Sequence, residues 1–282
     1  MSLTLITWNT QWCCGVDGRV DPTRIARDAM SIADFDVLCL QEIAVNFGGL
    51  AGSAGEDQIA LLAEALPDHR ALYGIATDQD DRRGGRRLFG NAIFSRLPVH
   101  QVYRHLLPWP ADPAVPSMQR LALEAVIEAP SGPIRILTTH LEYYSAQQRA
   151  AQVEALRTLH AEACGHALAP RMAGSPDEPF ASTPRPRSAV ICGDFNFVPE
   201  DSLRARMQAP LDSGTPRLID AWPLANGGSR HPPTVGVHDR RLPLGTWDYA
   251  FVTEDLAPRV RRVAADLVTT ASDHQPLLLV LD

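Results

Sequence analysis

The chain has 282 residues, a formal net charge of −7, and hydrophobic and charged fractions of 45% and 21%. The length allows one large domain or two small ones, and the fractions are typical of a globular protein with a substantial core. No apolar run reaches the roughly 18 residues of a membrane-spanning helix, which argues against stable membrane insertion. The net acidity argues against a protein that coats duplex nucleic acid through its overall field, although a local basic patch could still bind it.

The N-terminal segment and the cysteines indicate the compartment. The chain starts on a strand-like alternation, without the basic and apolar regions of a secretion signal, so we expect a cytoplasmic protein. Five cysteines, with Cys13 next to Cys14, match neither an even disulfide framework nor a paired zinc motif. Cys39 and Cys192 lie in apolar runs, where a reduced cysteine packs as a small hydrophobic residue.

The first third of the chain alternates strands with helices. A strand is predicted over residues 3–9, and Asp21 followed by Pro22 begins a helix with an apolar side. The continuous apolar run 36–42 is typical of a strand covered on both faces. A second helix is predicted over residues 56–66.

The middle of the chain is richer in strands. Glycine and proline separate five strand-like segments whose short loops predict antiparallel pairs, namely 70–76, 91–96, 98–104, 120–129 and 133–141. Ser145 then begins a long helix to about Cys164, with an apolar stripe on one side.

Residues 165–187 are rich in proline, glycine and serine and almost free of apolar side chains. Such a segment is too long for a routine connection, so we expect a disordered insertion or a mobile flap. Further strands are predicted over 188–196, 246–253, 259–268 and 275–282. With no repeat of fixed period, the pattern predicts one domain over residues 1–282, built from two sheets with helices outside.

Polar residues gather where the predicted strands end. One alone is more often a turn or capping residue, but here the set abuts apolar runs and includes Asn9, Glu42, His140, Asp194, Asn196, Asp248, Asp273 and His274. Converging carboxylates would repel one another without a cation or a partner. Carboxylate and amide oxygens are the ligands that Mg2+ and Mn2+ prefer, whereas the set is poor for zinc, and no GxSxG nucleophile motif is present.

Seven ordered motifs resemble those of the endonuclease/exonuclease/phosphatase family: "TWNTQW", "LQEI", "GNAIFSR", "TTHLE", "GDFN", "WDYAF" and "SDHQP". "GDFN" or "SDH" alone would occur by chance, but the ordered set spans Trp8 to Pro276. The resemblance implies an α/β, DNase I-like fold, a four-layer α/β/β/α sandwich of two mixed, largely antiparallel sheets flanked by helices. It also implies a Mg2+-dependent phosphoesterase, with Mn2+ as a possible substitute.

The resemblance assigns the metal and water sides of the site. Glu42 matches the principal Mg2+ ligand, with Asn9 contacting metal or phosphate and Asp273 as a further acid near the metal. Asp194 matches the residue that activates or holds the attacking water, and Asn196 orients the phosphate.

The histidines complete the resemblance. His274 matches the imidazole that hydrogen-bonds the phosphate, Asp248 matches the carboxylate that orients it, and His140 matches the second histidine of the DNase I-like branch. Arg120 and Asn91 are weaker matches. Arg120 is either a phosphate contact or an exposed strand residue, and Asn91 either supports the site or lies in a turn before a strand.

Two departures weaken a resemblance to abasic-site endonucleases, which carry Asp where this chain has Gln11 and Tyr where it has His140. A nuclease would use a basic groove, for which Arg82, Arg83, Arg86 and Arg87 are candidates. A phospholipid or sphingolipid phosphodiesterase would use exposed apolar loops, for which residues 106–116 are a candidate unless they form a packed connection.

A sugar or inositol phosphatase needs neither feature. A catalytically silent binding module is disfavoured because no central site residue is missing. The expected partner is therefore a phosphoester substrate, for which nucleic acid is one candidate, and the sequence indicates no protein partner.

Overall fold

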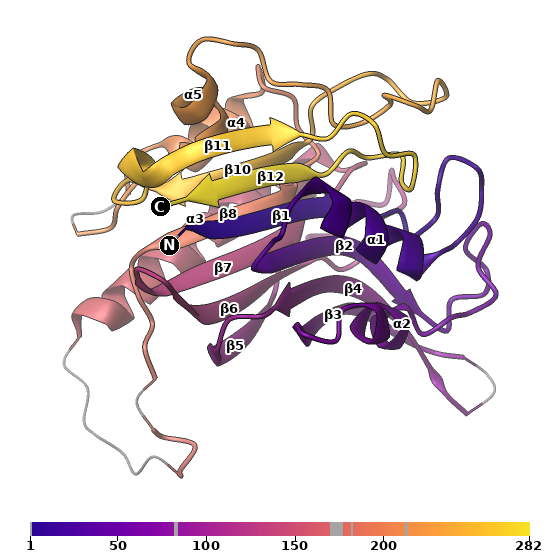
Figure 1. Ribbon diagram of the computed structural model, residues 1–282, viewed down its shortest axis with the longest axis horizontal. Coiled ribbons are helices and arrows are strands. Elements are labelled where there is room, and N and C mark those ends of the chain that lie inside the picture. The colour runs from indigo at the N-terminus through magenta and orange to yellow at the C-terminus, as the bar shows by residue number, and fades with distance from the viewer. Residues whose placement is uncertain (1, 82–83, 170–176, 182, 212–213) are drawn as a thin grey trace.

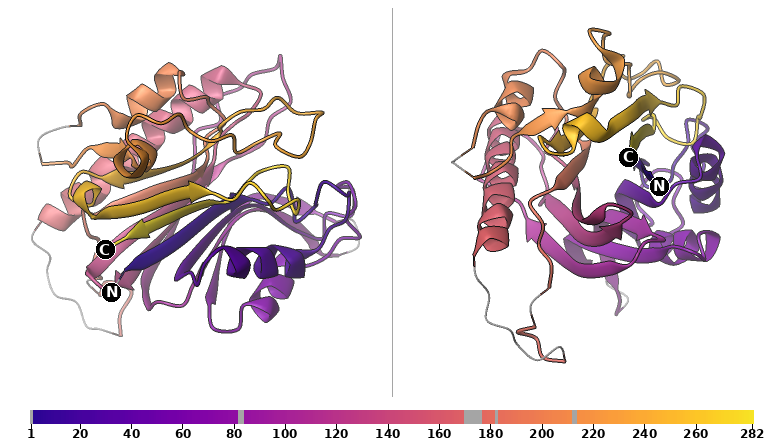
Figure 2. Two further views of the ribbon diagram at one scale, coloured as in Figure 1. Left: turned by 45° about the horizontal axis from the view of Figure 1, so that its top comes forward. Right: turned by 60° about the vertical axis from the view of Figure 1, so that its left-hand side comes forward.

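A computed structural model describes residues 2–81, 84–169, 177–181, 183–211 and 214–282. Two six-stranded sheets pack face to face, with helices on both outer faces (Figures 1 and 2). The first sheet has the order β11 (Val260–Ala265), β12 (Leu277–Leu281), β1 (Leu3–Asn9), β2 (Val37–Val45), β4 (Arg86–Ser95) and β3 (Arg70–Asp80). The second has the order β5 (Val99–Leu106), β6 (Leu121–Ala129), β7 (Gly132–His140), β8 (Ala189–Asp194), β10 (Asp248–Thr253) and β9 (Leu218–Asp220). The predicted four-layer sandwich is confirmed.

The helices divide between the two sheets. In the right-hand view of Figure 2, the long helix α3 flanks one side of the molecule and the two N-terminal helices flank the other. Outside the first sheet lie α1 (Pro22–Ile32) and α2 (Gln58–Ala65), and outside the second lie α3 (Ala146–Leu168) and α4 (Ser202–Gln208). The short helix α5 (Ala221–Asn226) and the 3-10 turn η1 (Ala257–Arg259) complete the described elements. No helix in the described part of the chain is long and apolar enough to cross a membrane.

Each sheet contains one parallel strand pair among its described strands. The pairs are β1 with β2 and β7 with β8, while the other described pairs are antiparallel. Parallel neighbours end at the same edge of a sheet. The carboxyl ends of β1, β2, β7 and β8 are therefore the natural place for a shared site.

Side-chain alternation along the strands builds three apolar layers. On β1, Leu5 points into the core between the sheets, whereas Ile6 packs under α1 and α2. On β8, Cys192 enters the same central core and Ile191 packs toward α3. Cys39 also lies in the central core, so Cys39 and Cys192 pack as small hydrophobic residues as predicted.

The predicted helix starts are confirmed by their caps. The Asp21 side chain accepts the backbone N–H of Arg24 at 2.9 Å, and the Ser145 side chain accepts that of Gln148 at 3.2 Å. The inner face of α3 is more polar than the predicted stripe, since Arg157 lies beside its apolar residues with 4% of its surface exposed.

One predicted strand pairing is wrong. Segments 91–96 and 98–104 are consecutive, but β4 belongs to the first sheet and β5 to the second. The link crosses between the sheets because Leu97 packs against the central core while Arg96 binds Asp34 and Asp36 on the outside. The sequence prediction also missed α4, α5 and the short β9.

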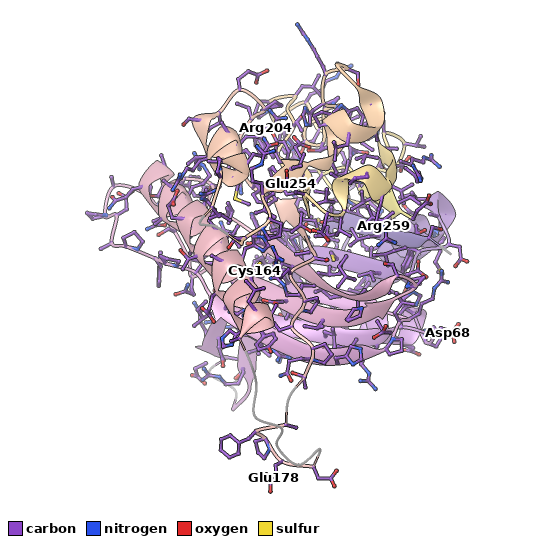
Figure 3. The ribbon with its side chains drawn as sticks, turned by 90° about the vertical axis from the view of Figure 1, so that its left-hand side faces the viewer. Asp68, Cys164, Glu178, Arg204, Glu254 and Arg259 are labelled. Atoms are coloured by element: carbon purple, nitrogen blue, oxygen red, sulfur yellow. The ribbon has the colours of Figure 1, made fainter. Side chains whose placement is uncertain are left out.

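The expected insertion at 165–187 is shorter than predicted. Its first residues continue α3 to Leu168, and residues 170–176 and 182 lie outside the described part. Beyond them, the buried Arg185 guanidinium lies 4.6 Å from the ring centre of Tyr103 and 3.3 Å from Glu162 Oε1. The stretch around Glu178 extends away from the body of the molecule (Figure 3). The expected mobility stays a prediction.

Candidate active site

Asn9 joins the two sheets at the carboxyl ends of their parallel pairs. Its side-chain Nδ2 donates to Glu42 Oε1 at 3.1 Å and to Asp194 Oδ2 at 2.9 Å, although Asn9 and Asp194 lie 185 positions apart in sequence. Asn9 is 1% exposed. A buried amide that satisfies two acids from different sheets fixes their separation.

The sequence had predicted that Glu42 ends a strand, but Glu42 lies within β2. The register of β2 against β4 shifts between Leu40 and Ile43, and Glu42 has a positive φ of 61°. This β-bulge re-aims the side chain at a cost of about 1–3 kcal/mol, which is typical of strain held at functional sites. Burial raises the pKa of Glu42, and the nearby charge of Asp273 raises it further.

Asp194 ends β8 in a tightly packed turn. A Cβ on the preceding Gly193 would lie 2.0 Å from the carbonyl oxygen of Thr139, and Gly193 has a φ of +132°, so glycine is required there. Asp194 Oδ1 accepts the backbone N–H of Asn196 at 2.9 Å, and Asn196 Nδ2 donates to the Leu141 carbonyl at 2.8 Å. Burial raises the pKa of Asp194 to about 7, close to the value that suits a general base at neutral pH.

His274 and Asp248 form a buried pair beside Asp194. His274 Nδ1 lies 2.9 Å from Asp248 Oδ2, and His274 Nε2 lies 3.8 Å from Asp194 Oδ2. Burial by itself lowers the pKa of His274, but the charges of Asp248 and Asp194 outweigh it and raise the pKa to about 10. His274 is therefore an imidazolium at neutral pH, oriented through Nδ1 with Nε2 free to donate.

His140 has the opposite charge state. Its Nε2 lies 3.4 Å from Asp194 Oδ2, and its Nδ1 lies 3.7 Å from Glu42 Oε1. Burial, and then the charge of Arg120, hold the pKa of His140 well below its usual range. The site thus pairs a neutral imidazole with a charged one on the same carboxylate.

Asp273 is held by Gln11, a residue that the sequence analysis noted only as a departure from the abasic-site enzymes. Gln11 Nε2 donates to Asp273 Oδ2 at 2.7 Å. Gln11, Trp12 and Cys13 all have positive φ values, of 49°, 44° and 58°. Three consecutive left-handed residues without glycine give no sequence signal, because side chains normally disfavour that conformation.

The donors on the Glu42 side fit a hard divalent cation. Glu42 and Asp273 are two oxygen donors whose pKa values are raised first by burial, so a cation between them would relieve an unfavourable charge. Asp194, Asp248 and His274 also lie close enough to hold an ion, but the closest atoms of Asp248 and His274 already bond each other. Asn9 turns its NH2 toward the carboxylates while its Oδ1 accepts the Gln11 N–H at 3.1 Å, so its role as a metal ligand stays a prediction.

Arg120 and Asn91 are both buried. The interpretation of Arg120 as an exposed strand residue and that of Asn91 as a turn residue before a strand are therefore wrong. Arg120 is 7% exposed and its Nε donates to Glu142 Oε2 at 3.1 Å, beside His140. It is not an exposed strand residue, because Glu142 pairs with it in the interior. Asn91 lies inside β4, 3% exposed, and donates to the Leu121 carbonyl at 3.3 Å, which supports the strand that follows Arg120.

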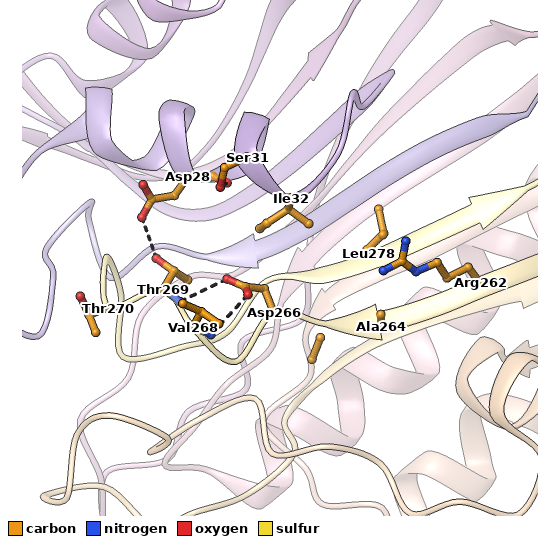
Figure 4. A pocket seen from close by; sticks show the side chains of 11 residues that line it. Asp28, Ser31, Ile32, Arg262, Ala264, Asp266, Val268, Thr269, Thr270 and Leu278 are labelled. Atoms are coloured by element: carbon orange, nitrogen blue, oxygen red, sulfur yellow. Dashed lines mark hydrogen bonds between the residues drawn. The ribbon is translucent and has the colours of Figure 1, made fainter.

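A cavity of about 330 Å³ opens beside the polar cluster. It is lined by Glu42, Arg120 and His140 together with the apolar side chains of Trp12, Phe47, Leu50, Phe89 and Met118. A larger cavity, about 630 Å³, lies between α1 and the segment that joins β11 to β12 (Figure 4). Its lining includes none of the predicted site residues, and its Asp28 and Thr269 bond each other. The smaller cavity is the one that belongs to the site.

The substrate-related sequence features have mixed outcomes. Arg86 pairs with Asp78, and the Arg87 guanidinium lies 5.4 Å from the ring centre of Phe47, while residues 82–83 lie outside the described part. In the proline-rich loop, Leu107 is buried, but Leu106 and Trp109 are 64% and 49% exposed. That loop is therefore packed at one point and exposed at others.

Comparisons with known proteins agree with this geometry. The model of the endonuclease/exonuclease/phosphatase family matches residues 6–274. No curated protein sequence matches the chain. A solved structure from Beutenbergia cavernae, described as an endonuclease/exonuclease/phosphatase, is 23% identical with a TM-score of 0.68, covering 99% of this chain and 71% of that one.

Two further solved structures share the fold at lower identity. A mannosyl-6-phosphatase from Bacteroides thetaiotaomicron is 17% identical with a TM-score of 0.68, and the match covers 99% of this chain and 100% of that one. TDP2 from D. rerio, complexed with a single-strand DNA product, is 17% identical with a TM-score of 0.65, covering 100% and 99%. The family model spans nearly the whole chain, so the chain belongs to the endonuclease/exonuclease/phosphatase family and is a phosphoester hydrolase.

Proposed function

We propose that this protein is a Mg2+-dependent phosphodiesterase, with Mn2+ as a substitute ion, in which a bound water attacks phosphorus in line. The observation that supports it best is the Asn9 bridge, which holds Glu42 and Asp194 on opposite sides of one polar cluster. One acid is then available to a cation and the other to a water. A divalent ion held by Glu42, with Asn9 and Asp273 beside it, would offset the negative charge of the phosphate and of the departing oxygen.

The protein's own groups would perform the proton chemistry. Asp194, with a pKa raised by burial to about 7, takes a proton from the attacking water. Asn196 orients the phosphate, with its backbone N–H bonded to Asp194 and its side-chain Nδ2 bonded to the Leu141 carbonyl. His274, kept charged by Asp248, donates from Nε2 to a non-bridging phosphate oxygen, where negative charge accumulates in the transition state.

The neighbouring cavity suits an organic substituent of the phosphoester substrate. Its volume of about 330 Å³ and its largely apolar wall suit an organic substituent next to the phosphate position. Arg120 and His140 line the same cavity, so a substituent bound there would leave the phosphate facing the polar cluster.

The free cysteines favour a reducing compartment. The five cysteines are free and buried in the structure, and such thiols persist most readily in the cytoplasm. We therefore place the protein in the cytoplasm as part of this proposal.

Hydrolysis of bis-p-nitrophenyl phosphate tests the proposal. We expect p-nitrophenolate release with Mg2+ or Mn2+, loss of release in EDTA, and recovery when the ion is restored. Glu42→Ala serves as the blank. Absence of metal-dependent release from this diester, and from a panel of DNA, RNA, lipid and sugar phosphates, would contradict the proposal and favour a silent binding module.

A further inference from the structure

A row of aromatic rings, the outer two of them exposed, leads away from the imidazole of His274. The ring centres of Trp247 and His274 are 5.8 Å apart, those of Tyr143 and Trp247 are 5.4 Å apart, and those of Tyr143 and Tyr144 are 4.8 Å apart. Tyr143 is 43% exposed and Tyr144 58% exposed. Exposed aromatic surface this close to a reactive group is a candidate contact for the substrate.

The exposed rings have no structural task that explains them. Among the described residues, neither the Tyr143 nor the Tyr144 hydroxyl has a hydrogen-bond partner, and neither ring belongs to the three apolar layers. A tyrosine that serves packing is normally buried, with its hydroxyl bonded to a partner. Tyr249 does this here, since it is 1% exposed and its hydroxyl donates to the Phe197 carbonyl at 3.1 Å.

The backbone beneath the rings is fixed on both sides. Glu142 accepts the Tyr144 N–H at 2.9 Å, and its own N–H donates to Gln152 Oε1 at 2.8 Å. Arg149 Nη1 donates to the carbonyls of Glu142 and Tyr143, each at 2.8 Å. Rings presented from a rigid segment lose little conformational entropy when they bind a ligand, which is the property of a built recognition surface.

The row lies on the His274 side of the polar cluster, whereas the apolar cavity adjoins Glu42, Arg120 and His140. Successive rings are tilted by 82°, 51° and 58°, so they form an open, angled surface and not a closed stack. A flat ring can lie against this surface beside Trp247, with its phosphate directed toward His274. An aliphatic or sugar group gains less from such a surface than a conjugated ring does.

We propose that Tyr143, Tyr144 and Trp247 form a stacking subsite for a flat aromatic ring of the phosphoester substrate, either a nucleobase or an aryl group. This inference rests on the proposed phosphoesterase function and specifies the substrate class. Tyr143 and Tyr144 are specificity-determining residues, and Trp247 both continues the surface and packs against His274.

Binding of matched phosphate monoesters tests the subsite without turnover. In an Asp194→Asn background with Mg2+, calorimetry compares thymidine 5′-phosphate, phenyl phosphate and ribose 5-phosphate, which share the phosphate but not the ring. We expect both aromatic ligands to bind about tenfold more tightly than ribose 5-phosphate, since one stacked ring commonly contributes that much. Tight binding of thymidine 5′-phosphate with weak binding of phenyl phosphate assigns the subsite to nucleobases, and the reverse order of affinities assigns it to aryl groups.

Ring substitutions separate stacking from a structural effect. We expect Tyr143→Ala, combined with Tyr144→Ala, to remove most of the aromatic preference, and the double Tyr→Phe variant to keep it. Phe180→Ala is the matched control, because Phe180 is 85% exposed and lies in the stretch that extends away from the body. An equal affinity for all three ligands in the parent, or equal weakening of all three by the alanine variant, overturns the subsite. If the wild-type protein hydrolyses no phosphoester at all, the proposed function fails instead.

Discussion

The two sheets of this molecule are built alike but contribute different chemistry. Each has six strands and one parallel pair among its described strands, and each parallel pair contributes one acid to the candidate site, Glu42 from within β2 and Asp194 from the end of β8. Glu42, from the first sheet, keeps 17% of its side chain exposed, whereas Asp194, from the second, keeps 2%. Glu42 lies near a second carboxylate, that of Asp273, whereas Asp194 lies between two histidines. Under the proposed function, the same architecture would hold a cation on one sheet and move a proton on the other.

The sharpest way to break this comparison is Asp194→Asn. Removing the proposed general base while keeping the shape should lower kcat by about 10²–10⁴-fold, with little change in the Mg2+ concentration needed for half-maximal activity. Steady-state kinetics over a Mg2+ titration measure both quantities. A variant with near wild-type turnover would show that proton transfer does not belong to the second sheet.

Glu42→Gln probes the opposite side. Because the change removes an ionised oxygen donor but keeps the side chain's size, we expect half-saturation by Mg2+ to shift at least about tenfold upward, with partial recovery of rate at saturating metal. Direct calorimetric titration of Mg2+ provides the measurement. If Asp194→Asn weakened metal binding more than Glu42→Gln did, the division between the sheets would be reversed.

Asp248→Asn tests whether Asp248, from the second sheet, orients the imidazole of His274. The amide keeps a polar contact to His274 Nδ1 but removes the negative charge that keeps the imidazole charged. We expect a loss of about 10–100-fold in kcat at neutral pH, below the loss from Asp194→Asn, with Mg2+ affinity retained. An unchanged kcat would contradict the assigned role of His274.

His160 gives the smallest effect and concerns stability alone. Its Nδ1 accepts a hydrogen bond from Arg135 Nη2 at 2.7 Å, and its Nε2 donates to the Pro216 carbonyl at 2.9 Å. A second proton on Nδ1 would therefore face the Arg135 donor and not an acceptor. Burial, and then Arg135, lower its pKa to about 4. The unfolded chain therefore binds more protons between pH 6.5 and 4, and stability falls as the pH is lowered through that range.

Urea denaturation at pH 7 and pH 4.5 measures that contribution. Between pH 7 and pH 4.5, the free energy of unfolding of His160→Gln should fall by about 2–3 kcal/mol less than that of the wild type. Both proteins share their other titrating groups, so the difference isolates His160. Parallel pH profiles would show that His160 is protonated in the folded state.

Much of this site could be predicted because its residues directly adjoin strands with clear patterns. Asn9, His140 and Asp194 end strands whose apolar runs are unambiguous, and their motifs come in a recognisable order. Gln11 could not be found in this way, since its position depends on a left-handed turn that its residue types disfavour. The contact of Tyr143 with Trp247 joins positions far apart in sequence, and periodicity carries no information about such pairs.

The fold shows the same limit. Local patterns located most strands to within a few residues, because burial on one or both faces leaves a period in the sequence. The crossing from β4 to β5 was missed because a short link is equally compatible with a hairpin. The polar inner face of α3 was missed because Arg157 is buried by bonding backbone carbonyls at the end of α4, which only the tertiary structure brings near.

The last strand of the chain lies in the interior of a sheet. β12 inserts between β11 and β1, so the N and C labels lie close together in Figure 1. During synthesis β1 is made long before β12, so the edge of β1 that faces β12 stays unpaired until β12 has been made. Asp273 and His274 immediately precede β12, so the candidate site is also completed at that step. A growing chain would thus hold an open sheet edge and an incomplete site until β12 has emerged, and an open edge of this kind is exposed to misassembly.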